Sequence, residues 1–299
     1  MYYRVTDSKS ELTSRIAAQQ GRLSLLQERL TTGKRINRPS DDPSGTEVVM
    51  SIRTTQTEIE QFRRNAETAW HKLTTADDTL NIYENVIDRI RTLVSRGMSD
   101  TTEQDAKNAL ATELETIRNQ VLSIANTKYG DEYVFGGTRQ NAPPFDPTTA
   151  VPAATPTVPQ YVQIEPGANA IATGATADTI FADAASDIFT DLTQAINALR
   201  GTGDPAADRA TLTTTMSRAN VYSDQAYAAR IRVGSNMNFT EIAKERLSTD
   251  HASLDERAAS IEGDDFAATA VEFANAQTSL EAMLQVTSYK RRTLFDFLG

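Results

Sequence analysis

Residues 47–96 read EVVMSIRTTQTEIEQFRRNAETAWHKLTTADDTLNIYENVIDRIRTLVSR, the longest regular stretch of the chain. After a first step of seven, apolar and small residues recur there at alternating steps of three and four: Ile52, Ile59, Phe62, Ala66, Ala69, Leu73, Ala76, Leu80, Tyr83, Ile87, Ile90 and Val94. This spacing is typical of a helix that packs along one narrow seam. At about 1.5 Å per residue the helix would be roughly 75 Å long, too long for a compact domain with one core. We therefore expect an elongated molecule.

Similar spacing predicts further helices over residues 9–31, 102–128, 188–199, 205–262 and from 266 to the end. Gly33 is expected to close the first of them in the left-handed conformation, and Thr102 to cap the second. Short strands are expected near residues 133–138, 160–164 and 179–181. The predicted fold class is mainly α, an elongated antiparallel helical bundle or coiled coil with a small β-rich insertion domain.

We expect three domains. Residues 1–45 and 263–299 would form a terminal coiled coil, and residues 46–138 and 187–262 a helical bundle. Residues 139–186 are rich in Pro, Ala, Thr and Gly and poor in large apolar residues. They form either a small β-rich outer domain or a partly disordered insertion.

The composition excludes several classes of function. The formal net charge is −10, which argues against nucleic acid as a partner, because phosphate binding needs a concentrated basic face. The chain contains no Cys and therefore no disulfide or thiolate metal site. It has no apolar run of about 18 residues, and its N-terminus has no apolar signal core. We expect no membrane partner, and export, if it occurs, without a cleaved signal peptide.

No residue pattern predicts chemistry. The two histidines, His71 and His251, fall on different predicted helices, and no nucleophile elbow of the type G-x-S-x-G occurs. Adjacent carboxylates on a helix diverge by about 100° and do not share a proton, so we interpret the Asp-Asp pairs as caps or solvated faces: Asp41–Asp42, Asp77–Asp78 and Asp264–Asp265. We expect no catalytic residue, no cofactor and no metal site.

The segment between the first two helices must leave the helical conformation. Pro39 and Pro43 each disfavour the helical conformation of the residue before them. The long helix that follows can then be capped by Asp41, Asp42 or Ser44.

The two terminal helices each carry an apolar seam that neither can bury alone. An isolated amphipathic helix of about 25 residues is marginal in water, so the two must pair with each other or with other subunits. The C-terminus is apolar enough to be an aggregation liability unless a partner buries it: Leu294, Phe295, Phe297 and Leu298.

Three stretches resemble the flagellin superfamily. They are ERLTTGKRINRPSDDPSG at residues 28–45, YGDEYVFGGT at 129–138 with Pro144-Phe145 after it, and the C-terminal block from IEGDDF at 261–266 to TLFDFLG at 293–299. Within the superfamily they are most similar to the family of hook–filament junction proteins, since flagellins usually have small residues in place of the two prolines. The Pro-rich insertion at 139–186 departs from the family pattern.

The resemblance implies a structural protein of the bacterial flagellum, without enzymatic activity. It would be exported through the flagellar type III pathway and form a layer between the first hook-associated protein and the flagellin filament. Its implied partners are the first hook-associated protein, flagellin, further copies of itself and an export chaperone before secretion, and its implied location is extracellular. Two alternatives stay open: a short flagellin that builds the filament itself, and a coiled-coil adaptor or chaperone.

The resemblance also implies the residues of the assembly interface. The turn at Asp41 and Asp42 would set the angle between the inner axial layer and the outer bundle. The layer itself would be formed by Leu12, Ile16, Leu23, Leu26, Leu30, Phe273, Leu280, Leu284, Leu294, Phe295, Phe297 and Leu298.

Overall fold

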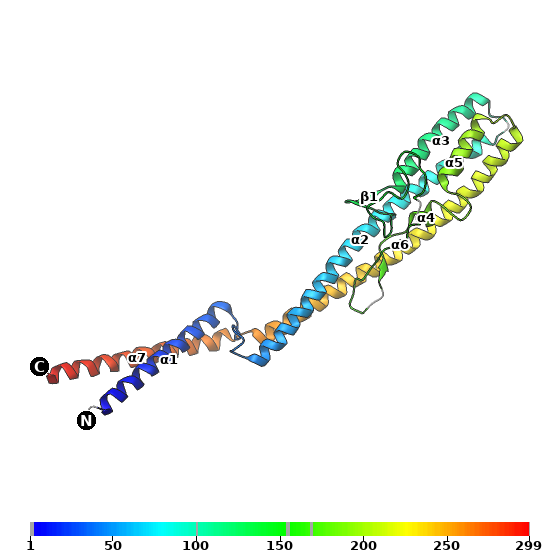
Figure 1. The fold of residues 1–299 in the computed structure, drawn as a ribbon. Helices are drawn as coiled ribbons and strands as arrows, with labels where there is room; N and C mark the ends of the chain where they lie inside the picture. The colour runs from blue at the N-terminus through cyan, green and yellow to red at the C-terminus, as the bar shows by residue number, and fades with distance from the viewer. Residues whose placement is uncertain (1–2, 100, 154–155, 168–169, 299) are drawn as a thin grey trace. The chain divides into compact units, whose positions relative to one another are not determined.

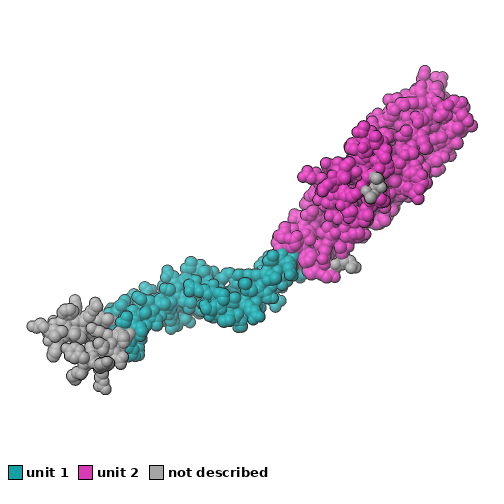
Figure 2. Space-filling model, in the orientation of Figure 1, with its two compact units in different colours: residues 1–58, 250–299 teal, residues 59–249 magenta. Residues whose placement is uncertain are grey.

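The computed structural model describes residues 3–99, 101–153, 156–167 and 170–298, with side chains described between residues 11 and 286 of these ranges. The chain divides into two compact units, shown in different colours in Figure 2. Unit 1 comprises residues 1–58 and 250–299, and unit 2 comprises residues 59–249. Both units are built mainly from helices, so the predicted fold class is confirmed.

Unit 1 contains the two terminal helices, the first part of α2 and the last part of α6. Helix α1 spans Tyr3–Thr32 and α7 spans Phe266–Leu298. The two longest helices, α2 (Pro43–Gly97) and α6 (Pro205–Glu262), begin and end close to the residues predicted from their apolar spacing. In unit 1 they run antiparallel, because the Gln56 amide donates to Asp255 Oδ1 at 2.6 Å and Arg53 pairs with Glu262.

The end of α1 is set by a glycine. Gly33 has a φ of +66°, and its N–H donates to the Arg29 carbonyl at 2.8 Å, which satisfies one of the last carbonyls of the helix. A side chain at this position would strain the left-handed backbone, which is the reason that the sequence pattern could locate the helix end correctly.

Unit 2 is a helical bundle with small strands on it (Figure 1). Its further helices are α3 (Gln104–Ala125), the single turn α4 (Ala177–Ile180) and α5 (Ile188–Arg200). Four two-residue strands form two antiparallel pairs, β1 (Lys128–Tyr129) with β2 (Glu132–Tyr133) and β3 (Tyr161–Val162) with β4 (Ile171–Ala172). Helix α3 packs most extensively on α5, and an ion pair between Arg89 and Glu113 joins it to α2.

One continuous core fills unit 2, with residues from α2, α3, α5, α6 and the segment between α3 and α5. Five aromatic rings meet in this core: Tyr83, Phe135, Phe145, Phe181 and Phe189. The ring of Phe181 contacts those of Tyr83, Phe135 and Phe145 at centroid distances of 4.7 to 5.9 Å. The segment 139–186 therefore shares its largest apolar side chains with the helical core. The predicted division into three domains stays a prediction.

Three local predictions need correction. The strand expected at residues 179–181 is a helical turn, because Phe181 N–H donates to the Ala177 carbonyl at 2.9 Å and its ring enters the aromatic cluster. The strand expected at 133–138 ends at Tyr133, and the chain turns so that Phe135 can be buried. Helix α3 begins two residues later than expected, and its N-cap is Glu103, whose side chain makes no capping hydrogen bond.

The aromatic cluster yields a stability prediction. Phe181 is fully buried, so Phe181→Ala should lower the free energy of unfolding by about 3–5 kcal/mol through lost apolar burial and a residual cavity. Urea unfolding followed by circular dichroism would measure the change. Ile82→Ala is the matched control, since Ile82 is half exposed on α2 and its truncation should cost no more than about 0.5 kcal/mol. Equal effects of the two variants would contradict the assigned core.

Candidate assembly interface

The two terminal helices pair with each other inside unit 1. Helix α1 runs antiparallel to α7, because the Gln19 amide donates to the Ala276 carbonyl at 3.0 Å and Arg22 lies 3.4 Å from Glu272. Toward the other end of the pair, Lys34 and Gly263 form an antiparallel β-bridge. The pairing of the termini with each other, one of the two options that the sequence left open, is thus present within one chain.

This pairing buries the apolar seam only in part. Leu26 is 2% exposed, whereas the other seam residues of α1 are half-buried: Leu12, Ile16, Leu23 and Leu30. On α7, Phe273 and Leu280 are half-buried and Leu284 is 48% exposed. Leu294, Phe295, Phe297 and Leu298 lie outside the residues whose side chains are described. A line of large apolar side chains therefore keeps accessible surface along the helix pair.

The face of α7 that lies on α1 is not the one with the largest side chains. Thr269 and Ala276 are the most buried residues of the described part of α7, at 5% and 4% exposure. They are seven residues apart, a spacing that repeats along one side of a helix pair, and their small size lets the two helices approach closely. A search for large apolar residues passes over them, and the step of seven is the signal that could have located them.

The turn between α1 and α2 is held by its two aspartates in different ways. Asp41 Oδ2 accepts from the backbone N–H groups of Asn37 and Arg38 at 3.1 and 2.8 Å. Asp42 precedes α2, and its Oδ1 accepts from the Gly45 N–H at 2.9 Å, so it is the residue that caps the long helix. Pro43 occupies the first helical position, where a missing N–H costs nothing.

The capping carboxylate of Asp42 is stabilised in its charged form. Hydrogen bonds from the Gly45 N–H, the Ser44 hydroxyl and the Arg35 guanidinium lower its pKa below the ordinary value. The cap also explains the glycine that follows, since a Cβ at position 45 would lie 2.6 Å from Asp42 Oδ2 and 2.7 Å from Ile36 Cδ1. The turn therefore has little freedom to change its conformation.

Glu262, at the end of α6, joins this turn to the rest of unit 1. Its carboxylate is nearly buried and pairs with Lys34 Nζ at 2.5 Å and with the Arg53 guanidinium. Its backbone carbonyl accepts from the Arg35 N–H at 2.6 Å. One residue thus binds the α1–α2 turn and the first part of α2 at the point where α6 gives way to α7.

Removing the charge of Glu262 should loosen this joint. Glu262→Gln leaves Lys34 and Arg53 without their counter-charge, at a cost of about 1–2 kcal/mol, because both cations are half exposed and solvent screens part of the loss. We expect trypsin to cleave the turn at Lys34 and Arg35 about five to thirty times faster, because local opening becomes more frequent by that factor. Glu256→Gln, an exposed position on α6, is the control and should leave the rate unchanged.

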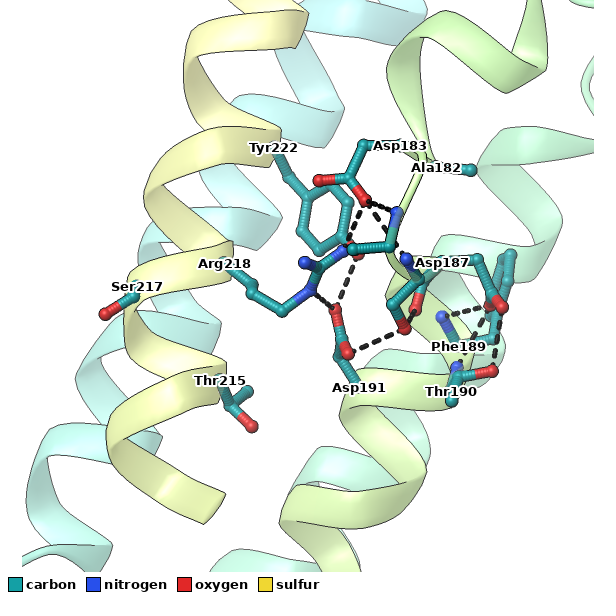
Figure 3. A network of polar contacts seen from close by, with 12 residues as sticks. Ala182, Asp183, Asp187, Phe189, Thr190, Asp191, Thr215, Ser217, Arg218 and Tyr222 are labelled. Atoms are coloured by element: carbon teal, nitrogen blue, oxygen red, sulfur yellow. Dashed lines mark hydrogen bonds and ion pairs between the residues drawn. The ribbon is translucent and has the colours of Figure 1, made fainter. Parts of the chain in front are cut away.

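A network of polar side chains lies in unit 2, where α5 meets α6 (Figure 3). Arg218 pairs with Asp183 at 2.9 Å and with Asp191, and the Tyr222 hydroxyl donates to Asp191 Oδ2 at 2.6 Å. The Ser186 hydroxyl donates to the second oxygen of Asp191 at 2.8 Å. The three charged groups of this cluster, Arg218, Asp183 and Asp191, are thus paired with one another.

The electrostatics of the cluster favour a fixed network and give no group that is poised to transfer a proton. Burial raises the pKa of the Tyr222 hydroxyl, and the hydrogen bond to Asp191 raises it further. The pKa of Arg218 is raised by its hydrogen bonds to Asp183, Asp191 and Tyr222, which outweigh the opposite effect of burial. Neither group titrates near neutral pH, so we interpret the cluster as a structural lock between α5 and α6.

The cluster should make unit 2 sensitive to acid. The Arg218 guanidinium and the N–H groups of Ala185 and Ser186 lower the pKa of Asp183 to about 2 from an ordinary value of 3.8. Since the folded pKa is the lower one, the stabilisation is complete above about pH 4 and is lost as the pH falls toward 2. Asp183→Asn should cost about 1 kcal/mol at pH 6, a value reduced by solvent screening, and almost nothing at pH 2. Urea unfolding at both pH values tests this, and a cost that does not vary with pH would contradict it.

The residues considered for chemistry lie apart from one another. The ring of His71 stacks on Tyr129 in unit 2, and His251 Nδ1 lies 3.1 Å from Asp255 in unit 1. Among the described residues no group of three or more His, Cys, Asp or Glu side chains is arranged to hold a metal ion. Within the same part of the chain, no helix has the length and apolar character needed to cross a membrane.

Comparison with known proteins shows similarity to proteins of the bacterial flagellum. The model of the bacterial flagellin N-terminal helical region matches residues 7–140. Flagellar hook-associated protein 3 of Salmonella typhimurium is 30% identical over 125 residues, which is 42% of this chain and 39% of that protein. Flagellar hook-associated protein 3 of Escherichia coli is 24% identical over 89% of this chain and 88% of its own length. The crystal structure of FlgL from Xanthomonas campestris shares the fold, with a TM-score of 0.63 at 16% identity, over 70% of this chain and 99% of that one.

The family model covers most of α1, the turn with its two aspartates, α2 and α3, and the similarity to the Escherichia coli relative extends over 89% of the chain. The chain is therefore similar to the bacterial flagellin N-terminal helical region over residues 7–140, and to flagellar hook-associated protein 3 over most of its length.

Proposed function

We propose that this protein is a structural subunit of the bacterial flagellum that forms the junction layer between hook and filament. The observation that carries the proposal is the apolar seam of α1 and α7, which one chain buries only in part. The similarity to hook-associated protein 3 and the arrangement of the α1–α2 turn support the same function.

The energetics of the seam favour completion by neighbouring subunits. Burying apolar surface contributes about 25 cal/mol per Å², so covering the remainder of each half-buried leucine would contribute roughly 1 kcal/mol. Summed over the seam, this contribution favours binding of a neighbour, whereas an isolated terminal helix is only marginally stable in water. A subunit of this kind would stay unassembled at low concentration and assemble on a template that offers a matching seam.

The proposed partners follow from this position. The first hook-associated protein would present the template on one side, flagellin would add on the other, and further copies of this chain would lie side by side within the layer. Before export through the flagellar type III pathway, a chaperone would cover the terminal seam, since an exposed apolar line promotes aggregation. The protein would then be extracellular.

The α1–α2 turn would give the layer its geometry. Asp41 and Asp42 fix the turn from inside, and Glu262 fixes it from α6. Because the direction in which α2 leaves α1 is held by these contacts, neighbouring subunits would present their seams to one another at a constant angle. Proteolysis of the free chain would report whether this joint is already formed before assembly.

Seeded assembly distinguishes this function from its alternatives. The purified chain is added to assemblies of the first hook-associated protein and, separately, to flagellin filament seeds, and growth is followed by electron microscopy. A thin, self-limiting layer on the hook-associated protein, to which flagellin then adds, is the expected result. Continuous growth of filaments would indicate a short flagellin. No growth on either seed would support a coiled-coil adaptor.

A charge on the seam should block incorporation. Leu284→Asp places a carboxylate where a neighbour would contact the seam, and Leu284 is exposed enough for the free chain to keep its fold. We expect the amount of protein incorporated on seeds to fall at least tenfold, which corresponds to about 1.4 kcal/mol of lost binding. Asn275→Asp, at an exposed position on the opposite side of α7, is the control and should incorporate normally. Normal incorporation of Leu284→Asp would exclude this part of the seam from the interface.

A further inference from the structure

Helix α6 carries a second line of exposed apolar side chains, within unit 2. Five large apolar residues are between 40% and 64% exposed there: Val221, Tyr227, Ile231, Phe239 and Ile242. At about 100° per residue they fall within one third of the helix circumference, and we call them the α6 stripe. The opposite side of the same helix is buried in the core through residues such as Tyr222, Ala229 and Val233. The stripe therefore faces away from the bundle.

The spacing of the α6 stripe suits a second helix. Tyr227, Ile231, Ser235 and Phe239 lie at steps of four, and such a row forms a ridge that fits the groove of another helix. Gly234 lies beside the middle of the row, and a Cβ built on it would meet nothing within 4 Å, so a neighbouring backbone has room to approach there. A contiguous line of exposed apolar side chains is more often an interaction site than single exposed apolar residues are.

The charge on the α6 stripe limits the kind of partner. The chain has a net charge of −10, so two copies repel each other unless they meet at surfaces with few charges. Between Val221 and Ile242, the positions on the arc of the stripe carry a single charge, that of Asp224, and the others are Ala228, Ser235 and Asn238. This is a surface on which copies of the acidic chain can meet without a large repulsion.

We propose that the α6 stripe binds a helix of a second copy of this chain, as a side-by-side contact within the layer. The proposal rests on the proposed function for the arrangement of copies, but it concerns a surface separate from the α1–α7 seam. Within a layer of side-by-side copies, each stripe would contact a helix of the neighbouring copy.

The absence of Cys from the chain allows a direct test. Ile231→Cys introduces a single thiol, which is labelled with a photoreactive maleimide in a mixture of isotopically heavy and light copies. Cross-links between heavy and light peptides are then read by mass spectrometry, in layers grown on seeds and in the concentrated chain without seeds. Ser248→Cys is the matched control, since Ser248 is exposed on α6 outside the arc of the stripe. We expect cross-links between copies from position 231 and few from position 248.

A second measurement uses charge. The double variant Ile231→Asp, Ile242→Asp should need at least about tenfold more protein to form the layer, whereas Ser248→Asp should behave like the wild type. Thermal unfolding with an unchanged midpoint would confirm that the exposed substitutions leave the fold intact.

The outcomes separate the two proposals. Absence of cross-links between copies from position 231 in both preparations, or cross-links only to the hook-associated protein or flagellin, would overturn the assignment of the stripe. This result would leave the junction function standing if flagellin still adds to the layer. Cross-links between copies without any layer on the seeds would support the stripe and count against the junction function.

Discussion

Unit 1 depends on one nearly buried carboxylate. Glu262 pairs with Lys34 and Arg53, and its backbone carbonyl holds the N–H of Arg35. A buried carboxylate is unfavourable unless cations compensate it, so this arrangement is stable only when the α1–α2 turn and the first part of α2 both lie against the end of α6. The folding of α1, the first part of α2, the last part of α6 and α7 is coupled in this way, although these segments share little apolar core.

The two units differ in how completely they bury their apolar residues. In unit 2 the aromatic cluster and the seam residues of α2 are buried almost completely, and the polar lock around Asp191 satisfies its own charges. In unit 1 the α1–α7 seam stays half-buried. Stability is therefore concentrated in unit 2. The partly exposed apolar residues of unit 1 are the ones that would contact neighbouring subunits in the proposed assembly.

Regular spacing and backbone constraints made much of the fold predictable. The a/d pattern located α2 and α6, and Gly33 located the end of α1, because these signals depend on local geometry. The strand expected at residues 179–181 failed because burial of Phe181 overrides local preference. Glu262 could not be found in the same way, since its partners are about 210 and 230 residues away in sequence and a single Glu at a helix end is usually solvated.

At the candidate interface, too, the sequence predicted the pairing of the helices but not which residues are buried in it. Large leucines predicted that the terminal helices would pair, yet the most buried described residues of α7 are Thr269 and Ala276, while Phe273 and Leu280 are only half-buried. This distribution of burial gives the seam its proposed role. If the largest side chains met inside the pair, one chain would bury its own seam and a neighbour would gain little by binding. Apart from Leu26, which is buried, the large side chains of the seam keep accessible surface, and a second subunit can complete their burial. On α6, likewise, one side of the helix is buried in the core through Tyr222, Ala229 and Val233, and the stripe on the opposite side stays exposed.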